Sequence, residues 1–174
     1  MTAESNAAPD RLALERVLTT LGVDFELFPC DPGLADTAAF CAAYGFALED
    51  SANTIVVAGK AQPPVYAACV VLATHRLDVN RSIRARLGTR KASFATPDQT
   101  RTLTGQEIGG VTPFGLPDHL PVWIDAAVMT RERIILGGGS RSWKVLAPPS
   151  ILLRLPGAEV VPGLAVPSSP RAAE

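Results

Sequence analysis

Apolar residues recur along the chain with two different periods, and the change of period separates predicted helices from predicted strands. Between Pro9 and Gly22 the leucines and valine fall near helical spacing, which predicts an amphipathic helix that opens at Pro9. The next six residues, VDFELF at 23–28, alternate apolar and acidic side chains. This period of two predicts a strand with one solvated face, which Pro29 ends.

Two later apolar runs show no alternation and therefore predict strands that are buried on both faces. The first, Thr54–Val57, is β-branched throughout, and the second is VYAACVVLA at residues 65–73. Two such strands in succession indicate the centre of one sheet. Ahead of them, the alanine-rich stretch Thr37–Tyr44 predicts a helix that Gly45 terminates.

The remaining segments predict short elements joined by loops rich in glycine and proline. They are a helix with Asn80 as its N-cap and its end at Gly88, a helix from Pro97 to Gly105, strands at 122–125, 134–136 and 143–146, a helix at 150–155 and a strand at 159–161. At 174 residues with 47% hydrophobic residues, the chain suits one compact domain. We expect a mixed α/β (α+β) domain at residues 9–161, with flexible ends at 1–8 and 162–174.

Composition and charge exclude several classes of protein. Three cysteines without CxxC spacing and only two histidines argue against a disulfide framework and against a metal site, and we expect no cofactor. The start of the chain lacks the pattern of a secretory signal, and no apolar run reaches the roughly 18 residues of a membrane span. We therefore expect a cytoplasmic protein without a membrane partner.

A basic segment is concealed by the net charge of −1. Between residues 74 and 94 one acid, Asp78, stands against six basic residues: Arg76, Arg81, Arg84, Arg86, Arg90 and Lys91. Arg81 and Arg84 are three apart and would share a helix face. The segment is either an ordinary solvated surface or a surface that contacts phosphate.

The stretch from Gly105 to Met129 is the one around which we expect the site to be organised. Adjacent glycines, Gly109 and Gly110, precede a run that ends in Pro113, which predicts a loop at the lip of the strand at 122–125. Glycines give backbone amides close access to an anion or a carbonyl oxygen. The alternative is a tight connection that binds nothing.

The order of these pieces, with GGVTPFG at 109–115 and IILGGGSRSWKV at 134–145, resembles the YbaK/EbsC family of prolyl-tRNA-synthetase-associated editing domains. The resemblance runs from about residue 11 to about residue 161. It implies a curved, largely antiparallel or mixed sheet around a pocket. Many members hydrolyse the ester bond of a tRNA charged with the wrong amino acid. The implied partner is the aminoacylated 3′ end of a tRNA, and association with a synthetase stays open, as does the oligomeric state.

The resemblance also implies site residues. The family's GxxxP motif maps onto Gly109 and Pro113, whose neighbouring amides would stabilise the charge that develops on the acyl carbonyl. With Gly110 and Asn53, these are the expected catalytic residues. The expected substrate-binding residues are Val111, Thr112, Phe114, Gly137, Gly138, Gly139 and Ser140, and the expected tRNA-binding residues are Arg76, Arg81, Arg84 and Lys91.

Two departures from the family leave alternatives open. Relatives carry a lysine ahead of the buried apolar run where this chain has Asn53, and a histidine where this chain has Cys30. An asparagine supplies no positive charge. The alternative to a trans-editing deacylase is therefore a non-catalytic module that binds an aminoacyl group or a related small ligand. A third hypothesis is a different hydrolase that uses Cys30 or His119.

Overall fold

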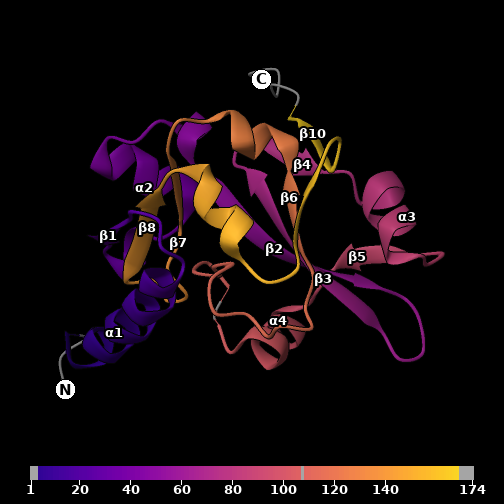
Figure 1. Ribbon diagram of the computed structural model, residues 1–174, viewed down its shortest axis with the longest axis horizontal. Helices are drawn as coiled ribbons and strands as arrows, with labels where there is room; N and C mark the ends of the chain where they lie inside the picture. The colour runs from indigo at the N-terminus through magenta and orange to yellow at the C-terminus, as the bar shows by residue number, and fades with distance from the viewer. Residues whose placement is uncertain (1–3, 107, 169–174) are drawn as a thin grey trace.

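A five-stranded mixed sheet forms the centre of the computed structural model, which describes residues 4–106 and 108–168 (Figure 1). Its strand order is β5-β2-β3-β6-β9. β2 (Ala52–Gly59) pairs antiparallel with β3 (Val65–Leu72) and β5 (Ala92–Phe94), whereas β6 (Val122–Asp125) runs parallel to β3 and β9 (Ala158–Val161). The prediction of two successive buried strands at the centre of one sheet is confirmed.

A second, three-stranded sheet contains the other predicted strands near the glycine run at 137–139. β8 (Trp143–Ala147) lies between β1 (Glu26–Pro29) and β7 (Ile134–Gly137), and both pairings are antiparallel. The glycine run after β7 is therefore part of a hairpin connection. A parallel bridge between Ser51 and Ile135 brings the start of β2 against β7, so the two sheets meet there.

Helices cover the sheets on the outside. They are α1 (Glu4–Thr20), α2 (Thr37–Tyr44), α3 (Arg84–Leu87) and α4 (Pro97–Thr104), with short 3₁₀ segments at Pro32–Leu34, Leu48–Asp50, Ala126–Thr130 and Pro149–Arg154. α2, α3 and α4 each end at a glycine in the left-handed conformation, where a side chain would be strained. α2 lies beside the three-stranded sheet and α3 lies at the far end of the molecule, next to β5 (Figure 1).

Four predicted boundaries are wrong. α1 begins at Glu4, so Pro9 lies inside the helix instead of opening it. Asn80 is not an N-cap but part of a π-helical turn, Val79–Ile83, that leads into α3. The segment after Pro148 is a 3₁₀ helix rather than an α-helix.

The predicted flexible tail from residue 162 is the fourth. Ala165–Pro167 forms β10, which pairs antiparallel with β4 (His75–Leu77). The side chain of buried Asp125 accepts a hydrogen bond from the amide of Ala165 at 3.0 Å, and Leu164 is fully buried. The last six residues, 169–174, lie outside the described residues.

An aromatic cluster fixes α2 against the three-stranded sheet. The ring of Phe28 on β1 makes edge contacts with Phe40, Tyr44 and Phe46, and the rings of Phe40 and Phe46 stack at 5.4 Å. Such pairs stabilise a core beyond the area they bury. The cluster places the beginning of α2 opposite the start of β2, where the cavity described below lies.

Candidate active site

A cavity of about 320 Å³ lies where the two sheets, α2 and the glycine-rich loop meet. Its walls come from residues far apart in the chain: 35–40 around the start of α2, 51–56 of β2, 94–95 after β5, 108–111 of the loop and 135–144 of the β7–β8 hairpin. Most of the lining is apolar, with a few polar groups at defined places. That combination is typical of small-molecule sites.

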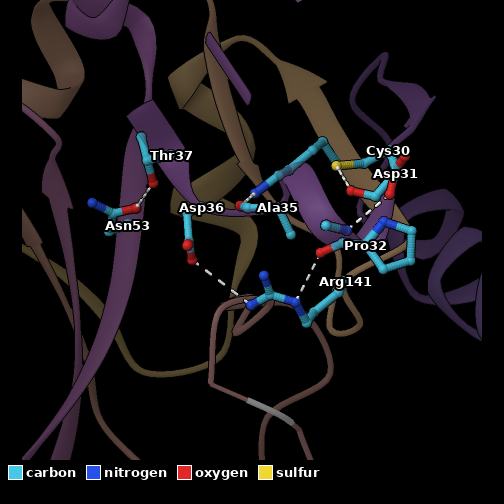
Figure 2. A network of polar contacts seen from close by, with 10 residues as sticks. Cys30, Asp31, Pro32, Ala35, Asp36, Thr37, Asn53 and Arg141 are labelled. Atoms are coloured by element: carbon cyan, nitrogen blue, oxygen red, sulfur yellow. Dashed lines mark hydrogen bonds and ion pairs between the residues drawn. The ribbon is translucent and has the colours of Figure 1, made fainter. Parts of the chain in front are cut away.

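Asn53 is one of these polar groups. Its side-chain oxygen accepts a hydrogen bond of 2.7 Å from the hydroxyl of Thr37, the first residue of α2 (Figure 2). The side-chain NH₂ donates to no residue in the described part of the chain. It can therefore donate to a carbonyl oxygen of a ligand.

Lys144 is the cation of the cavity, and sequence reasoning missed it. Only 7% of its surface is exposed. Its ammonium donates a hydrogen bond of 2.8 Å to the carbonyl oxygen of Ala35 and lies 5.3 Å from the centre of the Phe40 ring. Burial lowers the pKa of Lys144, because the charged form loses its hydration. The feature of the sequence that could have revealed Lys144 is a single lysine inside the otherwise apolar strand WKVLA.

The two glycine-rich runs pack backbone against backbone. The amide of Gly139 donates to the carbonyl oxygen of Gly110 at 2.6 Å. A Cβ on Gly110 would lie 2.5 Å from the carbonyl oxygen of Ser140, and a Cβ on Gly137 would lie 2.6 Å from that of Val111. Glycine is therefore required at these positions by the close approach of the loops.

The backbone amides of residues 109–112, in the first glycine-rich loop, divide into two groups. The amide of Thr112 is used internally, because it donates to the side chain of Gln106 at 2.8 Å. The amides of Gly109, Gly110 and Val111 donate to no acceptor among residues 4–106 and 108–168. Gly109 and Val111 both line the cavity. Two amides of cavity-lining residues, Gly109 and Val111, are thus without an acceptor in the described part of the chain.

Arg141 ties the hairpin to the turn ahead of α2 (Figure 2). Its side chain donates to the carbonyl oxygen of Pro32 at 3.1 Å and lies 3.8 Å from the carboxylate of Asp36. A Cβ on Gly109, whose φ is +94°, would collide with the Arg141 guanidinium. Gly109 is therefore needed both for its conformation and for this contact.

The structure brings part of the predicted site together and separates the rest. Asn53, Gly109, Val111 and Gly137 line the cavity. The other glycine-run residues, Gly110, Gly138, Gly139 and Ser140, stand behind that lining as the packed backbone of the two loops.

Three residues of the loop are packed elsewhere. Thr112 and Phe114 are buried, and Phe114 belongs to the main core. Pro113 lines a separate, smaller hollow beside α1. The placement of these residues does not support direct contact with a ligand in the cavity.

The predicted tRNA-binding residues lie outside the cavity. Arg76, Arg81, Arg84 and Lys91 are all exposed, and α3 lies at the end of the molecule away from α2 (Figure 1). Lys91 directly precedes β5, whose last residue, Phe94, lines the cavity mouth. β5 therefore runs between the basic segment and the cavity.

Cysteine and histidine chemistry finds little support in the geometry. The three cysteines are free and buried, and burial raises the pKa of the Cys30 thiol, which disfavours the nucleophilic thiolate. His119 is exposed on a loop that does not line the cavity. In the described ranges no group of three or more His, Cys, Asp or Glu side chains is placed to hold a metal ion, and no helix there is both long and apolar enough to cross a membrane.

Comparison with known proteins agrees with the fold. The family model of the aminoacyl-tRNA editing domain matches residues 31–155. The crystal structure of a hypothetical protein superposes with a TM-score of 0.78 at 23% identity, over 88% of this chain and 99% of the other. A proposed trans-editing enzyme for prolyl-tRNA synthetase superposes with a TM-score of 0.76 at 25% identity, over 88% of this chain and 96% of the other.

Proposed function

Because the chain belongs to the family of aminoacyl-tRNA editing domains, we propose that it is a trans-editing deacylase that hydrolyses the ester bond of a mischarged tRNA. The observation that carries the proposal is the convergence of Asn53, Gly109, Val111 and Gly137 on one small cavity. Two of these come from the glycine-rich loop and one from the second glycine run, so the motifs that identify the family also wall the cavity. One of the solved structures that superpose on this chain is a proposed trans-editing enzyme for prolyl-tRNA synthetase, which agrees with the assignment.

The proposed reaction needs hydrogen-bond donors more than it needs a nucleophilic side chain. Attack of water on the ester carbonyl places negative charge on the carbonyl oxygen. The NH₂ of Asn53 and the amides of Gly109, Gly110 and Val111 are donors without internal acceptors among the described residues, and they lie at or beside the cavity. Each donor aimed at such an oxygen is worth about 3 to 4 kcal/mol. The neighbouring hydroxyl of the terminal ribose would orient the water.

The cavity mouth suits the nucleoside end of the substrate. Phe94 and Ile108 both line it, and their side chains are 57% and 52% exposed, which is unusual for large apolar residues. An exposed aromatic ring is a platform on which a base can stack. The volume of about 320 Å³ is at the small end of the range for ligand sites. We therefore place the amino acid inside and the terminal adenosine at the mouth.

Hydrolysis of a panel of mischarged tRNAs tests the proposal. We expect wild-type protein to release one or a few amino acids, and Asn53→Ala to lower kcat/KM about 100- to 1,000-fold through loss of one donor. Asn80→Ala, which removes an exposed asparagine outside the cavity, is the matched control and should not change the rate. Gly110→Val should also abolish turnover, because its side chain would force the two glycine runs apart.

The alternative of a non-catalytic binding module is separated by one further measurement. A 3′-aminoacylamino analogue of the terminal adenosine cannot be hydrolysed and reports binding alone. Binding of this analogue without turnover of any substrate in the panel would replace the deacylase with the binding module. Neither binding nor turnover would remove both.

A further inference from the structure

We propose that the ammonium of Lys144 is a catalytic group of this cavity, which binds the carbonyl oxygen of the aminoacyl ester and stabilises the negative charge that forms there. The proposal rests on the deacylase function above and adds a residue to it. Asn53, at the start of β2, gives the cavity a neutral donor without positive charge. Here a different strand supplies the positive charge to the same cavity.

The surroundings of Lys144 offer few of the partners that a lysine with only a structural role would need. The side chain is 7% exposed, and no carboxylate within the described ranges lies close enough to form an ion pair with it. Its one acceptor among the residues that the structure describes is the carbonyl oxygen of Ala35, whereas an ammonium has three hydrogens to donate. A buried charge with so few partners is costly to the fold. Ionisable groups with pKa values shifted by burial cluster at functional sites.

The topology explains how side chains from β2 and β8 reach the same cavity. Lys144 on β8 stands opposite Gly137 on β7, and Gly137 lines the cavity. The bridge between Ser51 and Ile135 sets β7 beside the start of β2, two residues before Asn53. Strand alternation directs Val145 and Ala147 to the main core, while Lys144 points to the face shared with Phe40.

The same turn of chain holds both polar groups. Ala35 accepts the hydrogen bond of Lys144, and Thr37, two residues later, donates to Asn53. Figure 2 shows Ala35 and Thr37 close together, with Asn53 facing Thr37. A carbonyl oxygen placed at the start of α2 would therefore meet an amide donor from β2 and an ammonium from β8.

The chemistry of the step is a hydrolysis in which Lys144 keeps its proton. Water forms a bond to the carbonyl carbon and gives a proton to solvent through the ribose hydroxyl. The carbonyl oxygen becomes an oxyanion beside the ammonium. When the oxyanion collapses, the bond from carbon to the ribose oxygen breaks and that oxygen takes up a proton. The products are the free amino acid and uncharged tRNA.

The charged state of Lys144 depends on groups from each element around it. Its burial lowers the pKa, the thiols of Cys30 and Cys41 and the carboxylate of Asp36 raise it, and the guanidinium of Arg141 lowers it. Because the burial effect is the largest, the ammonium loses its proton at a lower pH than an ordinary lysine. Activity should therefore fall as pH rises through this lowered pKa.

Two variants separate charge from structure. Lys144→Gln keeps a donor for the Ala35 carbonyl and removes the charge, and Lys144→Met removes both. We expect both to lower kcat/KM on a mischarged tRNA by about 100-fold or more, with the alkaline decline of activity lost. The Tm of each variant should lie no more than a few degrees below that of wild type. Lys60→Met, which removes an exposed lysine, should behave as wild type.

The outcomes divide cleanly. Wild-type activity in Lys144→Gln, or a loss of activity that follows a loss of folded protein in both variants, would overturn the role of Lys144 and leave the deacylase intact. An active wild type with two folded, inactive variants supports the proposal. A wild type inactive on every substrate would instead remove the deacylase function, and with it this role of Lys144.

Discussion

Lys144 holds its charge where water cannot hydrate it, so a group that serves the reaction is a cost to folding. Burial lowers its pKa in the folded chain, whereas in the unfolded chain the pKa is the ordinary value of about 10.4. Between the two values the unfolded chain binds more protons than the folded chain. Stability from this residue therefore rises with pH in that window, and below both values the folded state bears the full cost.

Replacing Lys144 by methionine should expose this cost. At pH 7 we expect Lys144→Met to have a free energy of unfolding equal to that of wild type or up to a few kcal/mol higher, because a buried charge is replaced by an apolar chain of similar length. The difference should shrink as pH rises toward about 10, since wild type gains stability as its lysine discharges. Urea unfolding at several pH values measures it. A difference that stays constant with pH would contradict this account.

The residues of the candidate site could be predicted only where the signal is local. Gly109 and Gly137 were predicted because a glycine run marks a close backbone approach in the sequence itself. Pro113 and Phe114 belong to the same run, but a motif does not give the direction of a side chain, and both are packed elsewhere. Lys144 was missed because its burial comes from packing against α2, a segment more than a hundred residues earlier.

α2 is the element that gives the cavity its shape, and it is held by side chains more than by its own length. It has only eight residues, too few to be stable alone. Phe40 is 1% exposed and contacts the rings of Phe28, Tyr44 and Phe46. The helix therefore keeps its position through this aromatic cluster.

Truncation of two phenylalanines, one buried and one exposed, should change the free energy of unfolding by very different amounts. Phe40→Ala should lower the free energy of unfolding by about 3 to 5 kcal/mol, because it leaves a cavity in a closed cluster. Phe94→Ala, at an exposed ring, should change it by less than about 0.5 kcal/mol. If the mouth receives the terminal base, Phe94→Ala should instead raise KM. Thermal unfolding and steady-state kinetics on both variants check this, and equal destabilisation would refute the contrast.

Most elements could be predicted because residues within or next to each element determine its boundaries. The alanine-rich pattern and the glycine after it predicted both ends of α2, and apolar runs without alternation predicted β2 and β3. β10 could not be predicted in this way, because a strand of three residues, Ala165–Pro167, is too short to show a period. It is a strand only because β4 and the Asp125 side chain, far away in the sequence, offer partners for its backbone.

Charge is unevenly distributed over the molecule as a whole. The net charge is only −1, yet the exposed arginines of α3 and the turn before it form a basic surface at one end. The neighbouring Arg86 is engaged by Glu159 and stacks 4.9 Å from the Trp123 ring, so it has a structural role. Arg81 and Arg84 form no ion pair with described residues and are available to a phosphate backbone.

Removing these two charges should weaken tRNA binding in a salt-dependent way. We expect Arg81→Ala with Arg84→Ala to raise Kd and to reduce the slope of log affinity against log salt by about one unit for each lost phosphate contact. Arg16→Ala with Arg154→Ala removes two exposed arginines on α1 and near the end of the 3₁₀ helix Pro149–Arg154, and is the matched control. Binding titrations at several salt concentrations measure both. An unchanged slope would retire the basic surface as a tRNA contact.

The hydrogen bond between Lys144 and Ala35 joins residues 109 positions apart. A ribosome adds about 5 to 20 residues per second, so roughly 5 to 20 s separate the synthesis of the two walls. During that interval the residues of α2 have been made and the hairpin that covers them has not. A growing chain therefore acquires the lysine that we propose to be catalytic only when the hairpin is made, and a product released before that point would lack this group.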